Sequence, residues 1–249
     1  MTEKKGEQGG ERLNKIIAMA GITSRRSADG LISAGRVIVN GRVITKPGSK
    51  AIWRTDSITV DGSRIPGPPE NIYIILNKPF GYVSTLKDPE GRPIISDLIK
   101  DIKERVYPVG RLDFDSQGLL ILTNNGDLAF RLMHPRFHIP RTYKVTVDGN
   151  VTTQSVKRLK KGVFLGDGLT HPAVVKIINR EKDRTVLRLT IFEGRSREIR
   201  RMFEAVGHKT IKLIRTGYGD LVLGNLKVGK YRHLTNAEVT ILYASVGLG

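Results

Sequence analysis

A short polar stretch, Gly110-Arg111-Leu112-Asp113, places a carboxylate and a guanidinium just before the apolar run Leu119–Leu122. The turn signal Asn124-Asn125-Gly126 ends that run, so the pattern predicts a polar loop followed by a short buried strand. Catalytic groups are often held on loops braced by a rigid sheet. A loop salt bridge is the commoner meaning of such a pair. Asp115 is an equally suitable carboxylate, so these residues alone do not decide between the two.

Two other groups could take part in the same chemistry. Tyr143 lies in the alternating segment 141–147, which predicts a strand, and four arginines gather at positions 195, 197, 200 and 201. A lone strand tyrosine is usually a core residue, and a lone arginine is usually a surface charge or a phosphate contact. Spacing in the chain does not bring these groups to Asp113, so only the fold can.

Other classes of site are not indicated. The sequence has neither a GxxxxGK[ST] phosphate loop nor a GxGxxG after a strand. It has no cysteine, which excludes disulfides and thiolate chemistry. His134 and His138 have a metal-like spacing, but Pro135 and Pro140 disfavour a helix that would align them. We therefore expect neither a metal nor a cofactor.

Charge gives the strongest indication of a partner. The 249 residues contain 42 Lys and Arg against 24 Asp and Glu, a net charge of +18, which favours nucleic acid as the partner. An anionic membrane is the rival, but no basic amphipathic helix with bulky aromatic residues is present. No apolar run is long enough to span a membrane, and the N-terminus lacks a signal-peptide core. We expect a cytoplasmic protein.

The first part of the chain has the pattern of a small module. Residues 1–10 are expected to be a disordered tail. Two helices are expected, one over residues 13–20 and one over 25–33 capped by Ser24. Two β-branched runs flank Asn40-Gly41, which predicts a hairpin, and residues 57–60 form another short strand. We assign residues 11–64 to this module and residues 65–71, which are rich in proline, to a linker.

Basic residues cluster in this module, and they favour RNA binding over a merely solvated face. The segment RLNKIIAMAGITSRRSADGLISAGRVIVNGRVI resembles the small RNA-binding domain first described in ribosomal protein S-four. The residues that we expect to contact RNA here are Arg12, Lys15, Arg25, Arg26, Arg36 and Arg42.

Residues 72–249 form the second predicted domain. Strands are expected over 72–76, 119–122, 141–147, 174–178, 185–192 and 211–214. Helices are expected from a Ser96-Asp97 cap to residue 103, over 128–133 after an Asp127 cap, and over 153–161 and 197–206; a basic tail ends the chain. The fold class is α+β: a small N-terminal α/β module and a larger, mixed, mainly antiparallel-sheet domain.

Five ordered motifs carry a resemblance to the RsuA/RluB family of ribosomal RNA pseudouridine synthases. They read LNKPFGYVST, GRPIISDL, GRLDFDSQGLLILTNNGD, RTYKV and EGRSREIRRMFEAVGH. The resemblance implies that Asp113 is catalytic, that Tyr143 assists, and that Arg200 pairs with the aspartate. It implies RNA contact by Arg111, and we add Lys78, Arg195 and Arg201 to that set.

The implied reaction suits these residue types. Isomerisation of uridine breaks the bond between sugar and base nitrogen, turns the base and rejoins it through carbon. A carboxylate can attack the anomeric carbon or stabilise charge there, and a tyrosine can assist a proton transfer or pack against the base. We expect a monomer acting on ribosomal RNA or an assembly intermediate. The RSREIRR run resembles the RluB branch of the family more than RsuA, which implies RNA of the large subunit. The alternatives are a non-catalytic ribosome-binding factor and an RNA-binding module fused to a hydrolase.

Overall fold

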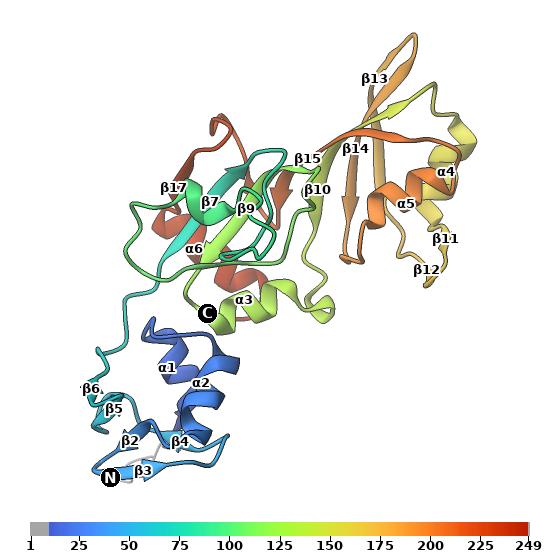
Figure 1. Ribbon diagram of the computed structural model, residues 1–249. Coiled ribbons are helices and arrows are strands. Elements are labelled where there is room, and N and C mark those ends of the chain that lie inside the picture. The colour runs from blue at the N-terminus through green and yellow to red at the C-terminus, as the bar shows by residue number, and fades with distance from the viewer. Residues whose placement is uncertain (1–9, 249) are drawn as a thin grey trace, which may run out of the picture. The chain divides into compact units, whose positions relative to one another are not determined.

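Figure 1 shows the computed structural model, in which residues 10–248 are described. The predicted tail, residues 1–10, lies outside this range except for Gly10. The chain forms two compact units. The first comprises the residues up to Asn71 with Lys103–Arg105, and the second comprises Ile72–Ile102 with Val106–Gly249. Each unit is described by itself.

The N-terminal unit packs two helices on short strands. Ser24 accepts a hydrogen bond from the Ser27 amide, so the predicted cap of the second helix is confirmed. Asn40 and Gly41 both have positive φ, 50° and 79°, the backbone that a tight hairpin requires. Strand order is β3-β2-β5-β6, with β1 paired to β4. The elements are β1 (Glu11–Arg12), α1 (Leu13–Met19), α2 (Arg25–Ser33), β2 (Val37–Val39), β3 (Arg42–Ile44), β4 (Lys50–Ala51), β5 (Ile58–Val60) and β6 (Ser63–Arg64).

The start of the predicted linker belongs to this unit. Ile65 is only 7% exposed and belongs to the same apolar core cluster as side chains of both helices. The Pro66 carbonyl accepts a hydrogen bond from the Trp53 indole at 3.0 Å. The chain therefore remains tied to the first core for two residues beyond the predicted boundary.

The larger unit is built on one sheet with the order β13-β14-β10-β15-β9-β7-β17. All neighbours on this path are antiparallel except β15 and β9, so the predicted α+β class is confirmed. The strands are β7 (Tyr73–Lys78), β8 (Tyr107–Pro108), β9 (Gln117–Thr123), β10 (Arg141–Asp148), β11 (Phe164–Leu165), β12 (Gly168–Leu169), β13 (Val174–Glu181), β14 (Arg184–Ile191), β15 (Thr210–Tyr218), β16 (Leu221–Val222) and β17 (Tyr231–His233).

Helices of this unit differ in part from the expectation. They are η1 (Ile95–Leu98), α3 (Gly126–Met133), η2 (Pro135–Phe137), α4 (Thr153–Lys161), α5 (Glu198–Glu204) and α6 (Asn236–Ser245). The helix expected to reach residue 103 is only the 3-10 turn η1. The cap of α3 is Asn125, whose side chain accepts from the Leu128 amide, and not Asp127. No element was expected for α6, although Thr235 and Glu238 form a capping box there.

The junction of β9 and β15 positions the functional site. These parallel strands pair over two residues, Ile214 with Gln117 and Arg215 with Gly118. Gly118 has φ +109°, and a Cβ there would lie 2.2 Å from the Arg215 carbonyl oxygen, so only glycine allows this approach. The close approach sets the loop before β9 beside β15, while β10 pairs with the other edge of β15.

Candidate active site

A cavity of about 610 Å³ lies in the larger unit, at the junction just described. The loop before β9 contributes Arg111 and Asp113, β10 contributes Tyr143, and β15 contributes Arg215. The structure thus brings together Asp113 and Tyr143, which are thirty residues apart in the sequence. Tyr143 is 7% exposed, so its ring forms part of the buried wall.

Two buried polar atoms in the wall have no partner within the described part of the chain. They are Nη2 of Arg215 and Oγ of Ser116, in residues that are 2% and 1% exposed. Buried polar groups are normally satisfied, and an exception calls for an explanation. Arg215 is held by its Nε, which donates to the Leu119 carbonyl at 2.6 Å. The wall of the cavity therefore holds two buried hydrogen-bonding groups that no described residue satisfies.

Arg200 does not pair with Asp113, which corrects the role implied by the resemblance. Its Nη2 donates to the Asp115 backbone carbonyl at 2.9 Å and lies 3.1 Å from Oδ1 of the same residue. Its Nη1 donates to the Thr210 carbonyl at 3.3 Å. The side chain is 8% exposed and is outside the cavity lining. Arg200 therefore fixes the loop that carries Asp113 instead of contacting the carboxylate.

Lys78 is not a surface RNA contact, contrary to the expectation. It is fully buried, and its ammonium donates to the carbonyls of Pro79, Asp113 and Ser116 at 3.0, 3.1 and 2.8 Å. Burial lowers the pKa of Lys78 to about 8, although the charges of Asp113 and Asp115 oppose this decrease. Lys78 therefore stabilises the backbone of the loop that carries Asp113.

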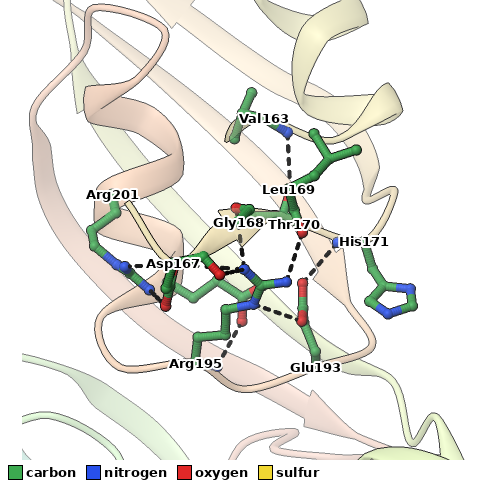
Figure 2. Close-up of polar contacts among 10 residues, drawn as sticks. Val163, Asp167, Gly168, Leu169, Thr170, His171, Glu193, Arg195 and Arg201 are labelled. Carbon is green, nitrogen blue, oxygen red and sulfur yellow. Dashed lines mark hydrogen bonds and ion pairs between the residues drawn. The ribbon is translucent and has the colours of Figure 1, made fainter. Parts of the chain in front are cut away.

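Figure 2 shows why Arg195 and Arg201 are also poor candidates for free phosphate contacts. Arg195 donates to the carbonyls of Gly168 and Leu169 at 3.2 and 2.7 Å and to the Glu193 carboxylate at 2.9 Å. Arg201 forms a two-pronged ion pair with Asp167, both contacts at 3.0 Å. Arg195 therefore holds the β11–β12 hairpin to the segment before α5, and Arg201 holds the same hairpin to α5 itself.

Two carboxyl groups in the cavity wall were not predicted. Burial, together with a hydrogen bond to Glu193, raises the pKa of Glu198 to about 7. Burial acts on Glu193 in the same direction, but hydrogen bonds from the His171 amide, Glu198 and Arg195 lower the pKa of Glu193. Near neutral pH Glu198 therefore keeps a proton part of the time, and it donates that proton in a hydrogen bond to Glu193. Their five-residue spacing gives no signal in the sequence.

Arg197, which the sequence placed in the candidate arginine cluster without a role of its own, also lines the cavity. It caps α5 with a left-handed backbone, φ 49°, which is uncommon for a residue other than glycine and often marks a functional site. Its side chain is 50% exposed and lies 3.4 Å from Asp115. The cavity thus combines the Asp113 carboxylate with exposed guanidinium groups of Arg111 and Arg197.

Basic residues of the N-terminal unit are mostly exposed. Arg12, Arg25, Arg26 and Arg42 lie on the surface. Arg36 is paired with Asp61 through two hydrogen bonds of 2.6 Å, and Lys15 contacts Glu11 at 2.9 Å. Contact of any of them with RNA stays a prediction.

Comparisons with known proteins agree with this geometry. Residues 72–205 match the RNA pseudouridylate synthase family. The chain belongs to that family. Its members are isomerases, and the matched segment contains Asp113, Tyr143 and Arg200. Residues 11–51 match the S4 domain, an RNA-binding domain.

Several relatives of this synthase are similar over nearly their whole length. The chain is 44% identical to the "Ribosomal large subunit pseudouridine synthase B" of Bacillus subtilis, with 94% of this chain and 96% of that protein covered. It is 45% identical to an "Uncharacterized RNA pseudouridine synthase" of Aquifex aeolicus, with 95% of each covered. A solved structure described as "Crystal structure of pseudouridylate synthase" superposes with a TM-score of 0.67 at 32% identity and covers 93% of this chain and 99% of that one.

In the described residues, no helix is long and apolar enough to cross a membrane. The same residues hold no group of three or more histidine, aspartate and glutamate side chains placed to share a metal ion.

Proposed function

We propose that this synthase converts a specific uridine of large-subunit ribosomal RNA to pseudouridine, with Asp113 as the catalytic residue. The observation that carries the proposal is the shared cavity of Asp113 and Tyr143 in a member of the RNA pseudouridylate synthase family. The similarity to relatives named for the large subunit favours that RNA over the small-subunit RNA. We also propose that the protein acts as a monomer, in the cytoplasm, on ribosomal RNA or an assembly intermediate.

The chemistry follows from the residues around the cavity. The target uridine leaves its stack and enters the cavity. The Asp113 carboxylate attacks the anomeric carbon, or stabilises the charge that develops there, while the bond from that carbon to the base nitrogen breaks. The base turns and forms a new bond from its C5 to the same carbon, and where Asp113 had bonded to that carbon, the bond to Asp113 breaks. The proton that C5 carried is then removed, and the base nitrogen that left the sugar takes up a proton. The reaction is an isomerisation, so no atom is gained or lost.

Other residues position the reacting groups. The unpartnered Nη2 of Arg215 and Oγ of Ser116 can donate to the carbonyl oxygens of the detached uracil. Tyr143 packs along the cavity and assists the final proton transfer or stacks on the base. Lys78 and Arg200 contact the backbone of Asp113 and Asp115, and they hold the loop in place from beneath.

The test is to replace Asp113 by asparagine, which keeps the shape and removes the charge. We expect single-turnover isomerisation on a large-subunit RNA transcript to fall by at least on the order of 10²–10⁴, while the dissociation constant for RNA changes little. Asp115→Asn is the matched control, because it removes a carboxylate two residues away. Substantial turnover by Asp113→Asn would refute the assignment.

Mapping pseudouridines in ribosomal RNA from cells with and without the gene identifies the substrate. A site that disappears from large-subunit RNA supports the proposal, and a site that disappears from small-subunit RNA would move the substrate to the other subunit. Identical maps would instead favour a non-catalytic ribosome-binding factor on the same fold.

A further inference from the structure

Two exposed phenylalanines flank the backbone of the candidate catalytic loop. Phe80 is 59% exposed and Phe114, the residue after Asp113, is 44% exposed. Their ring centroids are 6.3 Å apart and the rings are tilted by 52°. A single exposed apolar residue needs no explanation, but two aromatic rings left in contact on the surface of a site loop indicate a binding surface.

The pair is held by the same bonds that hold Asp113. The Gly81 amide donates to the Phe114 carbonyl at 2.8 Å. Lys78 joins the carbonyls of Pro79 and Asp113 from beneath. Gly81 has φ +78°, and a Cβ there would be 4.0 Å from the Phe114 ring, so the turn lies close against the ring. The two rings therefore form a preformed surface at a fixed place relative to Asp113.

The turn beside the strand that leads to Phe80 is basic, whereas the chain neighbours of Phe114 are the carboxylates of Asp113 and Asp115. The turn Lys227–Lys230 lies against the strand that precedes Phe80, because the Lys230 carbonyl accepts from the Asn77 amide and the Gly229 amide donates to the Asn77 carbonyl. Lys227 and Lys230 are exposed. An aromatic surface beside positive charge is the combination that binds single-stranded nucleic acid, with bases stacked on the rings and phosphates near the cations.

We propose that Phe80 and Phe114 form a stacking platform for an unpaired RNA base next to the target uridine. This inference rests on the proposed function, since a uridine that leaves its stack also exposes the faces of its neighbours. One neighbour is captured on the rings while the target occupies the adjacent cavity. The platform thereby favours substrates in which the flanking nucleotide is unpaired, and it reads shape and stacking instead of base identity.

The experiment measures binding of a large-subunit RNA transcript by Phe80→Ala, Phe114→Ala and the double variant. Loss of one base stack should raise the dissociation constant by about five- to 150-fold. The slope of log affinity against log salt should stay as in the parent protein, because stacking releases no counterions. Lys227→Ala with Lys230→Ala should instead reduce that slope. Phe130→Ala is the matched control, because Phe130 is 53% exposed and packs against His134 at 5.1 Å.

Conservative variants separate stacking from simple apolar contact. Phe114→Trp should retain tight binding, whereas Phe114→Leu should bind as weakly as the alanine variant. Full binding by Phe114→Leu, or an unchanged dissociation constant in the double variant, would overturn the platform. Thermal melts of the same proteins show whether each variant is folded.

Failure of the platform is distinguishable from failure of the proposed function. Turnover by the parent protein and its loss in Asp113→Asn test the function alone. If these hold while the phenylalanine variants bind normally, only the platform is wrong. If the parent protein shows no turnover, the proposed function fails, and the binding measurements still decide whether the rings contact RNA.

Discussion

Replacing Arg200 by glutamine tests whether the contacts of Arg200 with Asp115 hold the loop that carries Asp113 in place. The change removes the ion pair to Asp115 at 3.1 Å and the charge behind two hydrogen bonds, to the carbonyls of Asp115 at 2.9 Å and Thr210 at 3.3 Å. Hydrogen bonds to charged groups contribute about 1.5–3 kcal/mol each. The bond to Thr210 is long, and glutamine can retain one of these bonds, so we expect the free energy of unfolding to fall by about 3 kcal/mol. For a domain of this size that lowers Tm by roughly 6–12 °C.

A double-mutant cycle identifies the partner. Arg200→Gln combined with Asp115→Asn should show a coupling free energy of about 1 kcal/mol. We expect no more, because the Asp115 side chain is 34% exposed and has Arg197 as a second partner at 3.4 Å. The same cycle with Asp113→Asn should give less than about 0.5 kcal/mol. Denaturant unfolding supplies the four free energies of each cycle.

Kinetics complete the test. At saturating RNA the single-turnover rate of Arg200→Gln should fall, because the loop no longer fixes Asp113, while the dissociation constant changes little since Arg200 is outside the cavity lining. Stronger coupling to Asp113 than to Asp115 would refute this reasoning. So would an unchanged Tm with weakened, salt-sensitive binding, which would make Arg200 a phosphate-binding residue.

Three further outcomes follow from the other charged groups. The pKa of Lys78 is about 8 in the folded protein, against an ordinary value of 10.5. Between these pH values the native state therefore binds fewer protons than the unfolded state. We expect the free energy of unfolding to rise by up to about 3 kcal/mol from pH 8 to 10.5. Lys78→Met should remove this rise in urea titrations. The pKa of Glu198, about 7 against an ordinary 4.5, has the opposite sign, so its contribution to stability is lost as pH rises from 4.5 to 7. Glu198→Gln should flatten that fall in melts across the range. Replacing both Arg25 and Arg26 by alanine should reduce the salt slope of RNA binding by roughly 0.7–0.9 for each phosphate that the two side chains neutralise, and an unchanged slope would mean that these exposed side chains are only solvated.

The sequence predicted elements whose signals are local. Ser24 sits immediately before the residues that it caps, and Asn40-Gly41 specifies a tight turn by itself, so both were found without the fold. A choice between neighbouring caps was harder: Asn125 and Asp127 are both good capping residues, and only the geometry selects Asn125.

Partners distant in the chain could not be predicted. Lys78 and Arg195 look like surface cations in the sequence, yet each donates to carbonyls 26 or more residues away. The resemblance supplied Asp113 and Tyr143, but the partner of Arg200 depends on how α5 faces the loop and not on spacing. Glu198 and Arg215 escaped notice because their properties come from burial in the folded protein, which no local pattern reveals.

Because β9 pairs with β15 over only two residues, the sheet consists of two parts, here called leaves, that meet along this short pairing. One leaf is β9, β7 and β17, and the other is β13, β14, β10 and β15. The loop before β9 presents Asp113 from the first leaf, and β10 presents Tyr143 from the second, so neither leaf holds the site alone. Two hydrogen bonds join the leaves: Arg200 donates to the Asp115 carbonyl, and Arg215 donates to the Leu119 carbonyl. A chimera that exchanges one leaf between relatives must therefore keep Gly118, Arg200 and Arg215, because the contacts between the two leaves depend on all three residues.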